Sequence, residues 1–227
     1  MVVGYGDRAE EMRQADEYRA TQEYLKENAS IYGWPYSLAD LSGSEAALLV
    51  ETFQGTARLQ PPDAVSSCRL EIELLVDSAP RACLNFAELC AGWLNKQGVR
   101  YTYVGTAFHR YVKGFCLQGG DVNGRGGDSI YGGAFKDEKG GLKVLHEFGC
   151  VSMANSGPNT NRSQFFFCLS REAAKSIDGK HVVFGKVVND AGLAFLREVD
   201  ESLGRGGADG DERPPVGCDV FVIDAGC

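Results

Sequence analysis

The sequence is poor in the residues and spacings that bind metal ions. It has only three histidines in 227 residues, and His109, His146 and His181 lie too far apart to suggest a set of ligands. The eight cysteines form no C-x-x-C pair, and several lie in apolar runs. We therefore expect no zinc site and no disulfide framework, and predict reduced, mostly buried thiols of a cytosolic compartment.

Basic charge and long apolar runs are also scarce. The chain carries 23 lysines and arginines against 31 acidic residues, which gives a net charge of −8. Nucleic acids and anionic membranes attract basic surfaces, so neither is expected as the main partner. No apolar run approaches the length of a membrane span, and the first residues lack the pattern of a signal peptide. We expect a cytoplasmic protein.

Motifs for cofactors and for hydrolysis are missing as well. Gly204-x-Gly206-x-x-x-Gly210 departs from the dinucleotide fingerprint, and the glycine-rich stretch 123–127 has no Walker lysine. There is no G-x-S-x-G elbow and no H-E-x-x-H helix. We predict a loop at both glycine-rich stretches and expect no cofactor.

The composition changes near residue 45. Residues 7–28 are rich in helix formers, contain no glycine or proline, and carry only a thin apolar stripe. Such a helix is either solvated or docks on another surface. The aromatic segment 31–41 either packs on its own domain or meets a partner. We predict an N-terminal helical arm over 1–45, which could tether the protein, and a folded domain over 46–227.

The second part of the chain reads as rich in strands. Apolar and charged residues alternate over 68–77, which predicts a strand, and helices are predicted from Pro80 to about Gly92 and over about 190–200. Beyond residue 100, short apolar pieces alternate with glycine-rich turns. This pattern favours a closed or sandwiched all-β body, with a polar loop over 203–217.

Polar residues are set among aromatic ones in this body. Arg110 lies between Phe108 and Phe115, Gln118 precedes two glycines, and Gln164 precedes three phenylalanines. Each taken alone has a structural reading, as a buried arginine paired with a carboxylate or an amide that satisfies backbone groups. Together, a cation and several amides beside an apolar floor would suit a neutral ligand that carries amides, such as a peptide.

Four blocks carry a family resemblance, in the order FHRYVKGFCLQGGD, SIYGGAF, VSMANSGPNTNRSQFFFC and DGKHVVFGKV. They resemble the cyclophilins, the peptidyl-prolyl cis–trans isomerases, and the likeness covers roughly residues 65–227. The resemblance implies a mainly β fold, an eight-stranded antiparallel closed β-barrel capped by two α-helices, here with an N-terminal helical extension. It also implies a proline pocket on the outer face of the barrel and a proline-containing peptide or protein as the partner.

The resemblance also implies roles for ten residues. Arg110 would be the catalytic cation, which donates a hydrogen bond to the prolyl nitrogen in the twisted transition state with no covalent intermediate, and Phe115 and Gln118 would complete the catalytic group. His109 is expected to be structural. The substrate-binding residues would be Cys116, Ala154, Asn155, Gln164, Phe166, Ile177 and His181.

The sequence departs from the common family pattern at several positions. Cys116 stands where methionine is usual, Arg162 stands where a small residue is typical, and the usual tryptophan is missing near Ser176. These changes predict reduced activity. The alternative is a structural subunit of a large assembly, held through residues 1–45, with weak or no activity. The pattern up to FHR also resembles cyclophilin-like proteins of cilia, including a radial-spoke component, which suggests the axoneme.

Overall fold

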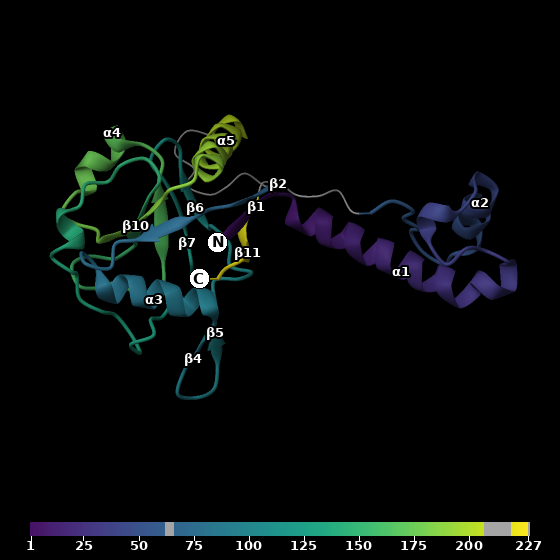
Figure 1. Ribbon diagram of the computed structural model, residues 1–227, viewed down its shortest axis with the longest axis horizontal. Helices are drawn as coiled ribbons and strands as arrows, with labels where there is room; N and C mark the ends of the chain where they lie inside the picture. The colour runs from purple at the N-terminus through teal and green to yellow at the C-terminus, as the bar shows by residue number, and fades with distance from the viewer. Residues whose placement is uncertain (62–65, 207–218, 227) are drawn as a thin grey trace. The chain divides into compact units, whose positions relative to one another are not determined.

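The computed structural model describes residues 1–61, 66–206 and 219–226 (Figure 1). The chain forms two compact units, one made of Met1–Gly6 and Ser66–Cys227 and the other of Asp7–Val65. The sequence placed a single boundary at residues 45–46, whereas the observed division falls at 6–7 and 65–66. The reason lies in strand β1 (Val2–Gly6), which pairs with two strands of the larger unit.

The larger unit is built from antiparallel strands. One sheet has the order β3-β10-β8-β9-β7-β6, and a second has the order β11-β1-β2. A short hairpin is formed by β4 (Trp93–Leu94) and β5 (Arg100–Tyr101). The remaining bounds are β2 (Ser66–Arg69), β3 (Ile72–Leu74), β6 (Arg110–Val112), β7 (Cys116–Gly119), β8 (Cys150–Met153), β9 (Phe165–Cys168), β10 (Val183–Val187) and β11 (Asp219–Asp224).

The mainly β, antiparallel fold is confirmed, but its expected division into eight strands of one closed barrel is not what the described residues show. They form eleven strands in three sheets. The segment before β6 meets β11 through an isolated bridge between Ala107 and Phe221 and through the backbone hydrogen bonds on either side of it, not through a continuous strand. The single strand predicted over 68–77 is also divided. Asn189 accepts from the Glu71 N–H and donates to the Arg69 carbonyl, both at 2.9 Å, where a continuous strand would pair with another strand.

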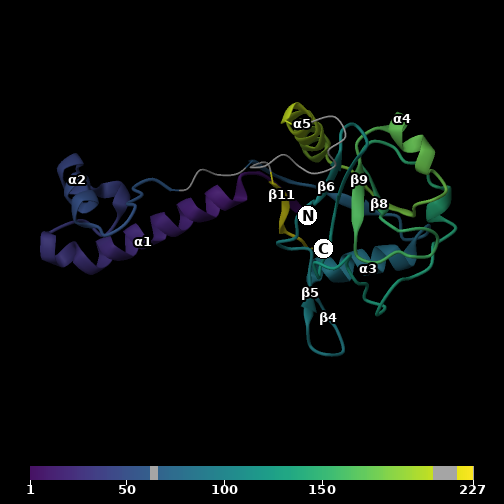
Figure 2. The ribbon, with the colours of Figure 1, turned by 180° about the vertical axis from the view of Figure 1, so that it is seen from behind.

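Helices lie on two sides of the larger unit, as Figures 1 and 2 show for α3 and α5. The predicted helix from Pro80 is confirmed as α3 (Pro80–Ala91), which ends at Gly92 in a left-handed conformation with φ 90°. Its Phe86 ring lies 5.2 Å from the rings of Phe165 and Phe184, at the centre of the core. A short helix, α4 (Arg171–Ala174), follows β9 and leads into the 3₁₀ turn η3 (Lys175–Ile177).

The helix predicted over about 190–200 is confirmed as α5 (Asp190–Gly206) and extends further than expected. The predicted loop over 203–217 is therefore wrong at its start. The Gly204 carbonyl accepts from the Lys113 side chain at 3.2 Å, which holds the end of the helix to the sheet. Residues 207–217 of that predicted loop lie outside the described residues.

The smaller unit is helical and has a core of its own. The helix predicted over 7–28 is confirmed as α1 (Arg8–Tyr32), which begins at the Asp7 cap and ends at Gly33. It is followed by the 3₁₀ turn η1 (Leu38–Asp40) and by α2 (Gly43–Thr52), which the sequence did not predict. The core consists of Leu25, Ala29, Trp34, Leu38 and Leu49. The aromatic segment thus packs on its own unit through Trp34, while Tyr36 stays 67% exposed.

The predicted burial of the cysteines is confirmed for most of those that the structure describes. Five have buried side chains, namely Cys83, Cys90, Cys116, Cys150 and Cys168, and Cys68 is half-buried. Cys218 and Cys227 lie outside the described residues. Within the described part of the chain, the helices are too short or too polar to cross a bilayer.

Candidate functional site

A row of side chains crosses one face of the larger sheet. The strand register places Arg110 opposite Gln118, and Gln118 opposite Phe166. Alternate residues of a strand point to opposite faces, so these side chains share one face while Leu117 and Phe167 point into the core. The consecutive strands β6 and β7 and the distant strand β9 thereby bring a cation, an amide and an aromatic ring to one place.

A chain of amides orients the Arg110 guanidinium. Arg110 Nη1 donates to Gln118 Oε1 at 3.2 Å, and Gln118 Nε2 donates to Gln164 Oε1 at 2.9 Å. Gln164 Nε2 in turn donates to Asp121 Oδ2 at 3.5 Å. Each amide therefore fixes the orientation of the next, and Gln118 presents an acceptor to the cation rather than its amide nitrogen.

The carboxylate at the end of this chain is ionised. Partial burial acts to raise the pKa of Asp121, but hydrogen bonds from the backbone N–H groups of Gly126, Asn123 and their neighbours outweigh it and lower the pKa. Asp121 therefore accepts from Gln164 as a carboxylate, which sets the direction of the amide chain.

The two glycines that follow Gln118 allow β7 to end against the core. A Cβ on Gly119 would lie 2.8 Å from the Phe108 ring. Gly120 has φ +79°, and a Cβ there would lie 2.7 Å from the Phe165 ring. Because these two glycines have no side chains, Gln118 is the last residue of β7 whose side chain can join Arg110 and Phe166 on this face.

Beside the row lies a cavity of about 280 Å³. Nine of the ten predicted site residues line it: Arg110, Phe115, Cys116, Gln118, Ala154, Asn155, Phe166, Ile177 and His181. The tenth, Gln164, hydrogen-bonds Gln118. The structure thus brings together all ten residues named from the sequence, while the role of each stays a prediction. His109, which was expected to be structural, is exposed.

Two histidine rings hold the Phe166 wall of the cavity. The His146 ring stacks on Phe166 at 5.9 Å with 8° between the planes, and the His181 ring meets it edge-on at 5.6 Å. His181 Nδ1 donates to the Met153 carbonyl at 3.0 Å, and burial lowers the pKa of His181. A neutral His181 is therefore fixed in the tautomer that leaves Nε2 unprotonated.

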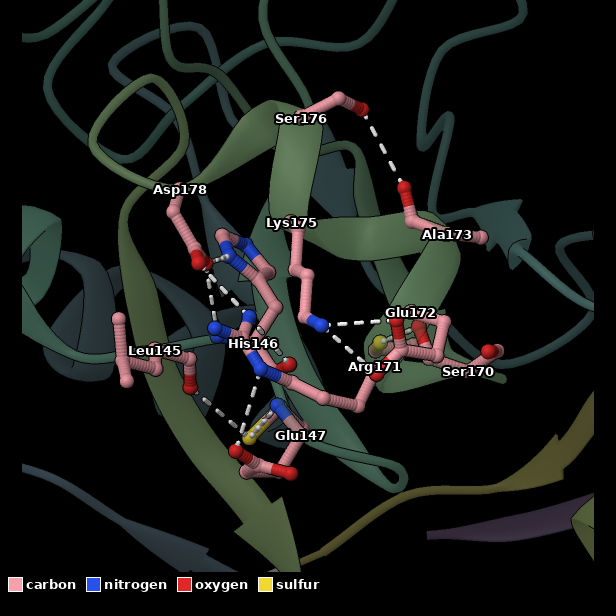
Figure 3. A network of polar contacts seen from close by, with 12 residues as sticks. Leu145, His146, Glu147, Ser170, Arg171, Glu172, Ala173, Lys175, Ser176 and Asp178 are labelled. Carbon is pink, nitrogen blue, oxygen red and sulfur yellow. Dashed lines mark hydrogen bonds and ion pairs between the residues drawn. The ribbon is translucent and has the colours of Figure 1, made fainter.

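A polar network behind Phe166, shown in Figure 3, was not predicted from the sequence. Asp178 Oδ1 accepts from the His146 backbone N–H at 3.0 Å and from His146 Nδ1 at 2.9 Å, and Asp178 Oδ2 accepts from Arg171 Nη1 at 2.7 Å. Partial burial acts to raise the pKa of Asp178, but these hydrogen bonds outweigh it and lower the pKa to about 2. The only signal in the sequence was a histidine inside an apolar run.

The network includes a Ser–His–Asp chain, since His146 Nε2 lies 3.0 Å from Ser152 Oγ. It is not a nucleophilic triad, because Ser152 and His146 are fully buried and no substrate carbonyl could reach the hydroxyl. Its effect is positional. His146 supports the Phe166 ring, and Asp178 directly follows Ile177, so one network fixes two walls of the cavity.

A family model described as "Cyclophilin type peptidyl-prolyl cis-trans isomerase/CLD" matches residues 64–220. The chain belongs to the cyclophilin family. Among curated relatives of this cyclophilin is the spliceosome-associated protein CWC27 homolog of Danio rerio, which is 44% identical over 147 residues. The match covers 64% of this chain and 28% of that protein. The family match begins at residue 64, so the smaller unit lies almost entirely outside it.

Two positions at which this cyclophilin differs from the common family pattern, Cys116 and Ser176, lie at or near the pocket. Cys116 is buried at the cavity floor and is paired across the strands with Cys168, whose thiol has its pKa raised to about 11 by burial. Ser176 is not among the described residues that line the cavity, and its hydroxyl donates to the Ala173 carbonyl at 3.2 Å. Ile177 of η3 supplies the wall at this side instead.

Proposed function

We propose that this cyclophilin is a peptidyl-prolyl cis–trans isomerase that acts on X–Pro bonds of peptides and proteins. The observation that carries the proposal is the pairing of Arg110 with Gln118 at a small cavity walled by Phe115, Phe166 and Ile177. A pyrrolidine ring is apolar and compact, which suits such a cavity. The peptide amides on either side of the ring would meet the polar residues that border it.

The proposed chemistry requires no bond to be made or broken. Amide resonance opposes rotation of the X–Pro bond, so uncatalysed isomerisation takes tens to hundreds of seconds. In the twisted state conjugation is lost, and the prolyl nitrogen gains a usable lone pair. Arg110 would donate a hydrogen bond to that nitrogen in the twisted state and not in the planar one. This difference in binding lowers the barrier.

The surroundings of Arg110 suit this task. Arginine keeps its charge at any relevant pH, and its planar fork can be held by Gln118 while another N–H faces the substrate. Phe115 and Phe166 would anchor the ring and exclude water, which strengthens the hydrogen bond. Gln164, Ala154 and Asn155 would bind the peptide backbone, and His181 would close the side of the pocket next to Phe166.

The test compares three proteins on a peptide with one X–Pro bond. Arg110→Ala should lower kcat/KM about 100-fold, which is typical for the loss of one preorganised donor. His109→Ala changes the exposed neighbouring residue and should keep the wild-type rate. If Arg110→Ala isomerises the peptide as fast as the wild type, the assigned mechanism is wrong.

The second candidate function is that of a subunit in a protein assembly, with the pocket secondary. It is favoured by the smaller unit, which has its own core and lies outside the family match apart from its last residues. The name of the Danio rerio relative associates that protein with the spliceosome, whereas the sequence pattern noted above resembles ciliary proteins. We propose that the protein is cytoplasmic and that the axoneme is the first assembly to test.

A further inference from the structure

A second cavity, of about 430 Å³, adjoins the proline pocket. The two share Gln118, Ala154 and Asn155 as walls. A peptide that places a proline in the first cavity would therefore bring a neighbouring side chain to the second. The remaining lining consists of Arg125, Gly126, Ala134, Ser156, Thr160, Arg162 and Gln164.

The charge of this lining is of one sign. Arg125 and Arg162 line the cavity, and no aspartate or glutamate does so among the residues that the structure describes. This contrasts with the whole chain, whose net charge is −8. A positive recess on an acidic protein would attract an anionic group and would hold a neutral one less well.

Both guanidinium groups have donors to offer a ligand. Within residues 1–61, 66–206 and 219–226, neither arginine forms an ion pair, and the one hydrogen bond of the Arg162 side chain goes to the Gly127 carbonyl at 3.4 Å. Each guanidinium carries five N–H donors in a planar fork. Such a fork binds a carboxylate or a phosphate through two parallel hydrogen bonds.

The acidic residues close to the cavity are engaged elsewhere. Asp121 accepts from the backbone N–H groups of Asn123, Arg125 and Gly126, and Asp128 accepts from the backbone N–H of Ser129. These bonds hold the two carboxylates at their own loop, and Asp121 Oδ2 also accepts from Gln164 Nε2 at 3.5 Å. They leave the cations of the recess without a partner carboxylate within the described lining.

The backbone on both sides of the recess is fixed. Asn123 Oδ1 accepts from the N–H groups of Arg125 and Gly127 at 2.9 and 3.0 Å, which closes the loop that carries Arg125. On the other side, Asn85 Nδ2 donates to the Arg162 carbonyl at 3.0 Å. The two arginines therefore project from held positions, and only their side chains need to adjust to a ligand.

We propose that this cavity binds an anionic side chain of the substrate, a carboxylate or a phosphorylated hydroxyl, close to the isomerised proline. Arg125 and Arg162 would then be the specificity-determining residues, and the preferred substrates would be acidic or phosphorylated near the X–Pro bond. The inference rests on the proposed isomerase function, which it deepens by naming a substrate class.

The experiment uses the full chain and peptides with one X–Pro bond, in which each position flanking that bond carries in turn Gln, Glu or phosphoserine. We expect kcat/KM to be about tenfold higher with Glu or phosphoserine than with Gln at one position, as expected for a hydrogen bond to a charged group. The preference should fall as salt is added, because both cations are exposed. The Glu and phosphoserine arms distinguish the two sources of the charge.

Two double variants test whether Arg125 and Arg162 cause the preference for the anionic peptides. R125Q/R162Q should abolish it, so that the Gln, Glu and phosphoserine peptides are isomerised at equal rates. R69Q/K96Q removes two exposed charges away from the cavity and should keep it. If the protein accelerates isomerisation, equal rates with Gln, Glu and phosphoserine at every position would overturn the proposal, as would a preference that survives in R125Q/R162Q.

Failure of the isomerase function has a different signature. Peptide affinity is measured in parallel by titration of the same proteins. A protein that accelerates no peptide, but binds the Glu or phosphoserine peptide more tightly than the Gln peptide through Arg125 and Arg162, supports the anionic site and overturns only the isomerase function. Equal affinities for the three peptides overturn the anionic site.

Discussion

At the scale of single residues, Gln118 sets the orientation of the Arg110 guanidinium. It accepts from the guanidinium with its oxygen and donates to Gln164 with its nitrogen. Because the Gln164 amide is itself oriented by Asp121, the oxygen of Gln118 cannot turn away without breaking the chain. The amide is therefore a positioning group for the cation as well as a wall of the pocket.

Gln118→Leu should lower kcat/KM about tenfold, because Arg110 loses the acceptor that fixes its fork. The loss should appear mainly in kcat, since the apolar walls that bind the ring remain. Gln97→Leu, at an exposed position, serves as the control and should keep both constants. A Gln118→Leu protein with unchanged kcat would contradict the positioning role.

At the scale of elements, the segment from α4 to η3 is held by charge where the common family pattern has a tryptophan. Arg171 Nη1 donates to Asp178 and to the His146 carbonyl, and Asp178 holds both donors of His146 (Figure 3). The His146 ring then stacks on Phe166. Two pocket walls from separate elements thus depend on one partly buried polar network.

This network predicts how stability varies with pH. Burial lowers the pKa of His146 from its usual 6.5, and the bond to Asp178 offsets this only in part. As the pH falls, His146 therefore becomes protonated in the unfolded chain before it does so in the folded one. The free energy of unfolding should consequently fall as the pH drops below 6.5. The pKa of His181 is lowered in the same direction. Asp178 does not contribute to the pH dependence of stability in the range where the histidines titrate, because its stabilising contribution is lost only as the pH falls from 3.8 toward 2.

Urea unfolding at pH 7, 6 and 5 measures this dependence. His146→Gln should flatten the slope relative to the wild type, even if it lowers stability at pH 7. A wild-type protein that is equally stable at pH 7 and pH 5 would show that His146 and His181 do not hold lowered pKa values.

The sequence could predict features that depend on residues close together in the chain or on a family pattern, but not contacts between distant residues. The ten pocket residues were predicted because their four blocks match a family, and α3 and α5 because their caps or apolar spacing are local signals. The pairing of His146 with Asp178 spans 32 residues, and that of Asn189 with Glu71 spans 118. No local pattern reports such partners, so the network behind Phe166 and the break between β2 and β3 emerged only from the structure.

At the scale of the whole molecule, the chain joins a cyclophilin unit to a helical unit inserted after its first strand. Residues 7–65 leave the larger unit after β1 and return at β2, and β1 pairs with β2 so that Tyr5 lies opposite Ser66. The insertion can therefore be replaced by a short turn. A deletion that began at residue 1 would instead remove a strand that pairs on both edges.

Replacing residues 7–65 with Asn-Gly leaves three residues between Tyr5 and Ser66, a common hairpin length. This variant should keep the isomerase rate and lose association with a native assembly, measured by co-sedimentation from cells. Arg110→Ala in the full chain should lose the isomerase rate and keep the association with the assembly. Unchanged co-sedimentation of the shortened protein would contradict the assembly role of the helical unit.

The proposed function requires this pocket to accelerate rotation about an X–Pro bond. Exchange NMR on a peptide with one such bond tests it most directly, because it measures cis–trans interconversion at equilibrium without a coupled reaction. The interconversion rate should rise in proportion to the concentration of the full chain, and an equal concentration of Arg110→Ala should give almost none of this gain. An interconversion rate that is the same with and without the wild-type protein would contradict the proposed function.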